Sequence, residues 1–376
     1  MAAHQFVCWV AGGAVRDLYL GRKVYDFDLV TDASTEALKQ IFPEAVLVGE
    51  SFGVLKIPVS NGELFDLATF RQESDYSDGR RPSTVNSSTP FEDAQRRDFT
   101  INALFWDDES GRLIDFIGGV KDLNLQTLRC VGDAVVRFTE DHLRIVRLIR
   151  FTAQLHFKIE EATELAAFKF IPKIQSVSGE RIWAELKKIA EARSWDFTLN
   201  SKLFSQFLLE IFKAPLKLDF LKKHNISTIE SFELEALFFI LINLDADANE
   251  TKKILASRLK LSKAELSIYE LIQFALTQLI GKSVYEICLQ FEKKEGLKKV
   301  LQFLVQLGIS QKELVNECEN LLDKYPVAVL SGHDLMSMLK GPEIGSALDE
   351  IRLLQFQGKI ASKDDAMKLI VMKKSP

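Results

Sequence analysis

The sequence predicts an α+β N-terminal domain followed by a longer, all-α remainder. Residues 6 to about 120 combine short β-rich runs with glycine-containing turns. From about residue 135 onward, apolar residues recur at spacings of three and four, which is typical of amphipathic helices. Pro215 is the only proline between Pro172 and Pro326, so little interrupts helices over this span. A chain of 376 residues has room for about two to three domains.

The composition excludes several classes of protein. The chain has 48 basic and 53 acidic residues and is 47% hydrophobic, which excludes a disordered tail, a collagen-like fibre and a histone-like basic protein. The apolar run 236–242 is far shorter than the ~20 residues of a membrane span. The four cysteines are scattered without a CxxC pair, so we expect no disulfide framework, no zinc site and a cytoplasmic location. Because no charged leader precedes the first apolar stretch, we also expect no targeting segment.

Five short runs are predicted to be strands of the N-terminal domain. They are residues 6–11, 26–31, 45–48, 54–59 and 64–69. Asn61 and Gly62 lie between the last two runs, and Asn-Gly is the strongest short-range signal of a β-hairpin. We therefore expect these two runs to pair with each other.

The segment 71–96 is polar with few apolar side chains, and we expect a long loop there, either functional or disordered. Further along the chain, 262–279 and 295–307 have the apolar spacing of helices. Ser262 and Glu265 have the spacing of a capping box, so the first of these helices is expected to begin at this point.

A glycine pair follows the first predicted strand. Gly12 and Gly13 lie at a strand-to-helix turn, where backbone N–H groups can approach a phosphate and the helix N-terminus favours an anion. Arg16, one turn later, can add a bidentate phosphate contact. By itself the segment is more typical of a tight turn with a surface arginine, and it lacks the spacing of a dinucleotide-binding fingerprint or of a P-loop.

Asp26 and Asp28 are separated by one residue. On a strand, such residues point to the same face, so both carboxylates are expected to project together. Like charges this close repel unless a cation lies between them, and hard oxygen ligands suit Mg²⁺. Two surface aspartates are the alternative, which the preceding glycine-arginine segment makes less favourable.

Asp66 lies among apolar residues of the predicted strand 64–69. A carboxylate is costly there unless a cation or metal pairs with it. Asp66 is therefore a candidate third carboxylate for a metal-dependent phosphoryl-transfer site, and Glu63, at the turn, is the weaker candidate.

The segment Arg96 to Leu104 has two adjacent arginines followed by an acid and an amide. Arg97, Asp98 and Asn102 are candidates to hold ribose hydroxyls and phosphate. A helix start with surface charges is the alternative.

Arg144, Arg147 and Arg150 recur every three residues and form a basic stripe on a predicted helix, with Asp141 close to the first of them. The plain alternative is a surface ion pair. Cytosine and adenine present an amine donor beside a ring-nitrogen acceptor, whereas uracil and guanine present the reverse. A fixed carboxylate beside a fixed guanidinium therefore complements the first pair of bases and rejects the second.

Together these segments resemble the class II tRNA nucleotidyltransferases, which comprise the bacterial and eukaryotic CCA-adding enzymes and the related bacterial poly(A) polymerases. Residues 115–123 are similar to the family's connector between head and neck, and residues 178–186 to its neck motif. Residues 331–335 and 341–345 look like the tail of bacterial members. The motifs that carry the resemblance are Gly12-Gly13-Ala14-Val15-Arg16-Asp17, Asp26-Phe27-Asp28, Arg96-Arg97-Asp98-Phe99-Thr100-Ile101-Asn102-Ala103-Leu104 and Glu140-Asp141-His142-Leu143-Arg144.

The resemblance implies a domain order and a set of site residues. Residues 1–123 would form a nucleotidyltransferase head with a DNA-polymerase-β-like palm, and 124–190 a neck that recognises the base. A helical body (191–325) and a tRNA-binding tail (326–376) would follow. Asp26 and Asp28 would hold Mg²⁺, with Asp66 completing the catalytic carboxylates. The implied nucleotide-binding residues are Gly12, Gly13, Arg16, Arg97, Asp98, Asn102, Asp141, Arg144, Arg147 and Arg150.

The implied reaction is attack of an RNA 3′-hydroxyl on the α-phosphate of CTP or ATP, with pyrophosphate leaving. We expect template-independent CCA addition to the tRNA 3′ end, because the tail segments resemble those of CCA-adding members. A bacterial poly(A) polymerase and a member restricted to A addition share this core and are alternatives. A catalytically inactive RNA-binding descendant is the alternative from a different class. We expect a monomer or homodimer that does not contact a membrane.

Family members restricted to CC addition are described as lacking a flexible loop between the first acidic motif and the Arg-Arg-Asp motif. Such a loop is expected here around residues 76–82, so we predict that A addition is retained. Deleting residues 75–82 should spare C addition and cripple A addition, because the resemblance links the loop to the last step only. The effect of the deletion is measured as incorporation of CMP and AMP on tRNA transcripts that end before and after CC. Equal loss of C addition and A addition would contradict the prediction.

Overall fold

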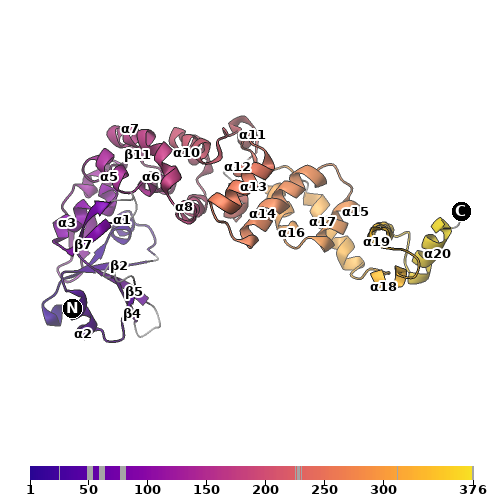
Figure 1. Cartoon of the computed structure of the whole chain (residues 1–376), viewed down its shortest axis with the longest axis horizontal. Coiled ribbons are helices and arrows are strands. Elements are labelled where there is room, and N and C mark those ends of the chain that lie inside the picture. Colours follow the sequence, from indigo (N-terminus) through magenta and orange to yellow (C-terminus); the bar gives the residue numbers. More distant parts are fainter. Residues whose placement is uncertain are drawn as a thin grey trace. The chain divides into compact units, whose positions relative to one another are not determined.

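The computed structural model describes residues 1–24, 26–48, 54–58, 64–76, 82–224, 226, 229, 231–310 and 312–374. The chain forms two compact units, Met1–Pro215 and Leu216–Pro376 (Figure 1). Within the described residues every strand belongs to the first unit, and the second is built from helices. The predicted α+β domain followed by a helical remainder is therefore confirmed, whereas the finer division into head, neck, body and tail stays a prediction.

A seven-stranded sheet forms the centre of the N-terminal part. Its strand order is β3-β4-β5-β2-β1-β8-β9, and only β2 and β5 pair in parallel. The five predicted strands are confirmed as β1 to β5, with β4 and β5 paired as expected, and β8 and β9 extend the sheet. The bounds are β1 Cys8–Ala11, β2 Asp28–Thr31, β3 Val46–Val48, β4 Val54–Pro58, β5 Leu64–Thr69, β8 Leu104–Asp107 and β9 Arg112–Asp115.

One aromatic cluster packs the middle of this sheet. Trp9 of β1 lies 5.5 Å from the ring of Phe70 and 6.0 Å from that of Phe105. Ala11 and Val30 are buried in the same cluster. Because side chains alternate between the two faces of a strand, burying these residues fixes which face of β1 and β2 is apolar.

The predicted loop over 71–96 is wrong for most of its length. β6 (Arg71–Tyr76) pairs antiparallel with β7 (Pro82–Ser87), and α3 (Pro90–Gln95) follows. The backbone ladder of this two-stranded sheet does not need an apolar sequence, and the capping box that opens α3 is also polar. Residues 77–81, the turn at 61–62 and Glu63 lie outside the described residues.

The remaining elements of the first unit are mostly helices, and α6 packs against α8 while α5 packs against α7. A short parallel pair, β10 (Thr127–Leu128) with β11 (Lys158–Ile159), lies among them. The helices are α1 Gly13–Tyr19, α2 Thr35–Ile41, α4 Gly119–Asn124, α5 Ala134–Glu140, α6 Leu143–Leu155, α7 Glu161–Phe170, α8 Gly179–Glu191, α9 Trp195–Leu199 and α10 Lys202–Phe212.

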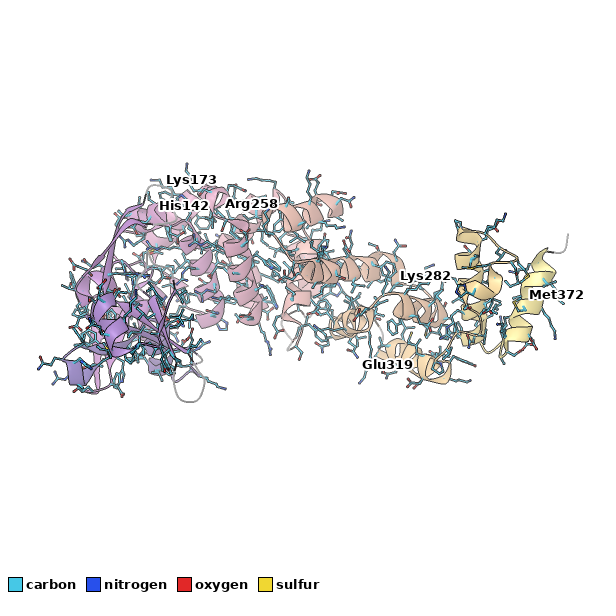
Figure 2. All side chains as sticks on the ribbon, turned by 60° about the horizontal axis from the view of Figure 1, so that its bottom comes forward. His142, Lys173, Arg258, Lys282, Glu319 and Met372 are labelled. Atoms are coloured by element: carbon cyan, nitrogen blue, oxygen red, sulfur yellow. The ribbon has the colours of Figure 1, made fainter. Side chains whose placement is uncertain are left out.

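The second unit is a series of helices. The predicted capping box of Ser262 and Glu265 opens α14, and Met372 of α20 is highly exposed (Figure 2). In the part of the chain that is described, no helix is both long and apolar enough to cross a membrane. The helices are α11 Leu218–Lys223, α12 Glu233–Ile242, α13 Ala248–Lys253, α14 Lys263–Phe274, α15 Val284–Lys293, α16 Leu297–Gln306, α17 Lys312–Lys324, α18 Gly332–Leu335, α19 Pro342–Phe356 and α20 Lys363–Lys374.

A glycine-containing connector leads from the sheet to α4. The carboxylate of Asp115 accepts hydrogen bonds from four consecutive backbone N–H groups, those of residues 117–120, and so caps the helix. Gly119, the first helical residue, packs so closely on Thr100 that a Cβ atom there would lie 2.2 Å from its carbonyl oxygen. The connector therefore requires glycine because a side chain has no room.

Gly119→Ala is predicted to destabilise the first unit by about 1–3 kcal/mol, because the backbone must shift to admit the methyl group. Fluorescence-detected thermal unfolding measures this, since all four tryptophans (Trp9, Trp106, Trp183 and Trp195) lie in that unit. Gly345→Ala is the control, because a Cβ at this position in α19 meets open space. Equal fluorescence transitions for Gly119→Ala and the control would contradict the prediction.

Candidate active site

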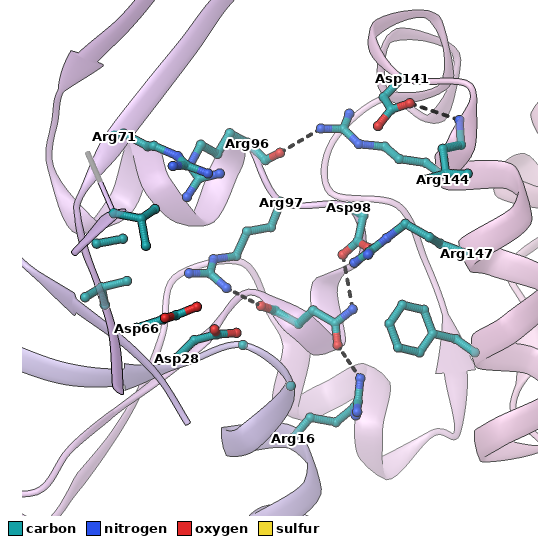
Figure 3. A pocket seen from close by; sticks show the side chains of 18 of the residues that line it. Arg16, Asp28, Asp66, Arg71, Arg96, Arg97, Asp98, Asp141, Arg144 and Arg147 are labelled. Carbon is teal, nitrogen blue, oxygen red and sulfur yellow. Dashed lines mark hydrogen bonds and ion pairs between the residues drawn. The ribbon is translucent and has the colours of Figure 1, made fainter. Parts of the chain in front are cut away.

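A cavity of about 620 Å³ opens where the sheet meets α6 and α8 (Figure 3). Its lining is strongly charged, with eight arginines and four aspartates, which suits a polyanionic ligand. All the predicted site residues line it except Asp26, which is exposed outside the lining. The lining residues are Gly12, Gly13, Arg16, Asp28, Leu29, Val30, Val54, Asp66, Ala68, Arg71, Arg96, Arg97, Asp98, Asn102, Asp141, Leu143, Arg144, Arg147, Arg150, Phe151 and Arg181.

Two carboxylates lie side by side at one end of the cavity. Asp28 begins β2 and is in register with Asp66 on the parallel strand β5, so both side chains project from the same part of the sheet (Figure 3). Burial and the charge of Asp26 raise the pKa of Asp28; Arg97 opposes the rise, and Asp66 adds to it. Lys56 Nζ lies 2.7 Å from Asp66 Oδ1. Negative charge is therefore concentrated at this point, and a cation already compensates part of it.

Asp26 precedes β2 instead of lying on it. Strand alternation therefore does not fix the direction of its side chain, although its charge acts on Asp28. Among the described residues, no group of three acidic, histidine or cysteine side chains forms a preformed metal cage. Asp28 and Asp66 nevertheless fit Mg²⁺, because this ion usually binds one or two carboxylates and completes its shell with water and substrate phosphates.

The glycine turn after β1 places Arg16 in the cavity. Gly12 has φ +72°, a conformation that favours glycine, and a Cβ there would lie 2.7 Å from a guanidinium nitrogen of Arg97, so another residue would also displace that side chain. Arg16 is almost fully buried and donates to Asn102 Oδ1 at 2.7 Å and to both carboxylate oxygens of Asp17. The arginine is therefore held in one orientation before any ligand binds.

Asp98 connects three parts of the wall. Its carboxylate accepts hydrogen bonds from Arg147 Nε at 2.7 Å, from Asn102 Nδ2 at 3.1 Å and from the backbone N–H of Phe99. Burial opposes its ionisation, but the guanidinium of Arg147 and the Asn102 hydrogen bond outweigh burial and hold the pKa of Asp98 far below its ordinary value. Asp98 is therefore a buried group that is ionised at neutral pH.

Asp93 is a site residue that the sequence analysis missed. This fully buried side chain of α3 pairs with Arg96 at 2.6 Å and with Arg97 at 2.9 Å. Burial raises the pKa of Asp93, but the two guanidinium groups outweigh burial and lower it. A sequence signal for Asp93 does exist. It follows the Thr89–Glu92 capping box directly, and Arg96 and Arg97 lie three and four residues after it, the spacings of ion pairs on a helix.

The predicted base-reading residues lie together on the far wall. Arg144 is nearly buried and donates to the carbonyl oxygens of Arg96 and Arg137 and to the carboxylate of Glu140. The carboxylate of Asp141 accepts from the backbone N–H of Leu143 at 3.0 Å and from Arg181 at 2.7 Å. Both side chains are therefore fixed by partners that the sequence analysis did not assign.

Arg147 and Arg150 surround the ring of Phe151 together with Arg16. The three guanidinium carbons lie 4.0–5.7 Å from the ring centre, close enough for cation–π attraction. Burial lowers the pKa of Arg150, and the ion pair with Glu185 of α8, at 2.6 Å, opposes that effect. Glu185 is thus a second buried carboxylate that the sequence analysis did not identify.

Comparison with known proteins identifies the family. A model described as "Poly A polymerase head domain" matches residues 8–129, and one described as "Probable RNA and SrmB- binding site of polymerase A" matches residues 156–211. The CCA-adding enzyme of Streptococcus suis is 30% identical over 97% of this chain and 92% of its own length. That of Lactococcus lactis subsp. lactis is 34% identical over 92% of this chain and 88% of its own.

Solved structures share the fold. A crystal structure of the Bacillus stearothermophilus CCA-adding enzyme in complex with CTP has a TM-score of 0.74 at 22% identity, covering 99% of this chain and 95% of the other. The Thermotoga maritima CCA-adding enzyme complexed with tRNA has a TM-score of 0.66 at 21% identity, covering 99% and 92%. The expected family is confirmed: over nearly its whole length, this nucleotidyltransferase chain belongs to the family of the CCA-adding enzymes.

Proposed function

We propose that this protein transfers CMP and AMP from CTP and ATP to the 3′ end of tRNA without a template, releasing pyrophosphate. The observation that carries the proposal is that one cavity joins a carboxylate pair, an arginine cradle and the Asp141–Arg144 wall. The full-length likeness to curated CCA-adding enzymes supports tRNA as the acceptor. In the reaction, the RNA 3′-oxygen forms a bond to the α-phosphorus, the bond to the pyrophosphate breaks and the hydroxyl proton leaves.

The arginines are proposed to hold the triphosphate and ribose. Arg16 and Arg97 lie next to the glycine turn, and both are oriented by fixed acceptors, so their charges are in place before the nucleotide enters. Prearranged charges of this kind stabilise the negative charge that develops on transferring phosphates without reorganisation. Asp98 and Asn102 are proposed to position the ribose.

Asp28 and Asp66, with Asp26 nearby, are proposed to hold Mg²⁺, since hard oxygen donors lie side by side there. When bound, this ion would favour deprotonation of the attacking hydroxyl and neutralise charge on the leaving pyrophosphate. The protein's own contribution is the spacing of the two carboxylates, which the parallel pairing of β2 and β5 determines.

Asp141 and Arg144 are proposed to select the base. An ionised carboxylate only accepts hydrogen bonds and a guanidinium only donates them. The pair therefore complements the amine and ring nitrogen of cytosine or adenine and leaves uracil or guanine with mismatched polar groups.

For the place of action we propose the cytoplasm, because all four cysteines are free thiols, which suits a reducing compartment. A monomer or homodimer stays our prediction.

Nucleotide incorporation on tRNA transcripts ending before CCA, after C and after CC tests this function. With Mg²⁺, CTP and ATP, addition is expected to stop after CCA and to ignore an unstructured RNA. Long A tails without use of CTP would identify a poly(A) polymerase instead. Asp28→Ala distinguishes an active enzyme from an RNA-binding protein without activity. In an active enzyme, this variant should still bind tRNA but lose nucleotide incorporation about 10²-fold or more.

Asp66→Asn is predicted to lower kcat at least about 100-fold, because the substitution keeps the shape but removes a charge that the metal site needs. Lys56→Met is the matched control, since it breaks the same exposed ion pair and leaves the carboxylate in place. The kcat values of Asp66→Asn and Lys56→Met are measured by steady-state CMP incorporation. Glu63→Gln is measured in the same assay, because Glu63 is the other candidate for the third carboxylate. Similar small effects of Asp66→Asn and Lys56→Met would remove Asp66 from the catalytic set.

A further inference from the structure

The carboxylate of Asp141 is fixed at both of its oxygens by groups from two different helices. Oδ1 accepts the backbone N–H of Leu143, in the first turn of α6, at 3.0 Å. Oδ2 accepts Arg181 Nη2, from the start of α8, at 2.7 Å. Both side chains are largely buried, with 16% of Asp141 and 28% of Arg181 exposed. The orientation of this acidic group therefore depends directly on Arg181.

Arg181 belongs to α8, a helix with two charged residues that pair with residues lining the cavity. α8 packs against α6 and carries Arg181 and, four residues later, Glu185, which pairs with Arg150. Residues four apart lie on the same face of a helix, so Arg181 and Glu185 extend from the same side of α8, towards Asp141 and Arg150. Of the two, Arg181 itself lines the cavity.

One terminal guanidinium nitrogen of Arg181, Nη1, has no hydrogen-bond partner within the described part of the chain. Nη1 is buried and finds no hydrogen-bond acceptor among the residues that the structure describes. Buried donors are almost always satisfied, so one in the wall of a binding cavity indicates an acceptor that arrives with the ligand. Cytosine and adenine both offer ring-nitrogen acceptors.

We propose that Arg181 is a specificity-determining residue of the nucleotide site. Its Nη2 holds the Asp141 carboxylate towards the base, and its Nη1 donates to an acceptor of the bound amino-bearing base. The inference rests on the proposed function and deepens it, because it adds a third member to the Asp141–Arg144 wall. Without Arg181, the carboxylate loses its counter-ion and rotates, so a base that presents a carbonyl group in place of an amine is no longer rejected.

Arg181→Met and Arg181→Lys test this proposal by kcat/KM for CTP, ATP, UTP and GTP on a tRNA transcript ending before CCA or after CC. In Arg181→Met, discrimination of CTP against UTP should fall at least about tenfold, with KM for CTP rising more than kcat falls. Arg181→Lys should recover part of the discrimination, because the ammonium group still pairs with Asp141 but offers no second fork nitrogen.

A double-mutant cycle with Asp141→Ala separates this role from a structural one. If Arg181 acts through Asp141, adding Arg181→Met to Asp141→Ala should change discrimination little further. Arg129→Met is the matched control, because Arg129 is likewise a partly exposed arginine of the first unit that pairs with carboxylates, those of Asp122 and Glu160, but it does not line this cavity. That variant should discriminate as the wild type does.

Unchanged discrimination in Arg181→Lys and Arg181→Met, both folded by thermal unfolding, would overturn the proposal. Full additivity with Asp141→Ala would overturn it as well, because the two residues would then act separately. Wild-type protein that incorporates neither CMP nor AMP would refute the proposed function instead, so the two failures are distinguishable.

Discussion

The cavity depends on the buried negative charge of Asp98. This carboxylate joins Arg147 of α6 to Asn102, and the amide oxygen of Asn102 in turn holds Arg16 of α1. Three segments distant in the sequence are thus connected through one ionised group. Because 34% of the Arg147 side chain is exposed, removing it should cost less than the about 3–5 kcal/mol of a fully buried pair, but it would leave the buried Asp98 carboxylate without this counter-ion. The helix that carries the basic stripe is therefore tied to the sheet by charge as well as by packing.

The arginines of the wall can lie together because carboxylates lie behind them. Asp93 stands behind Arg96 and Arg97, Glu140 behind Arg144, and the set is completed by Asp17, Asp98, Glu185 and Asp141, which pair with Arg16, Arg147, Arg150 and Arg181. Each pair relieves repulsion between neighbouring cations and orders a flexible side chain during folding. The conformational entropy of these arginine side chains is therefore lost during folding and not when the nucleotide binds. Cations ordered in this way favour binding of the phosphate charge.

Local sequence signals predicted the elements that carry the site but not all of its members. The strand-to-helix turn at Gly12 is confirmed, and its positive φ and its close approach to Arg97 explain why glycine is favoured there. The polarity of the segment 71–96 predicts a loop, whereas a backbone ladder forms there with few apolar side chains. Asp93 lies in that segment, so its ion pairs on the helix α3 were missed for the same reason. Arg181 lies within the neck-like segment 178–186, but nothing near it in the sequence indicates Asp141 as its partner.

Local sequence predicts most of the strands and helices, several of their caps and the residue types available for chemistry, because these depend on neighbours within one or two turns. Which of those residues meet depends on the tertiary structure. Asp28 faces Asp66 because β2 and β5 pair in parallel, and Asp141 meets Arg181 because α8 packs on α6. Sheet order and helix packing follow from burying apolar faces of distant segments together. This burial is a property of the whole domain, so the local spacing of residues does not predict which distant segments pack together.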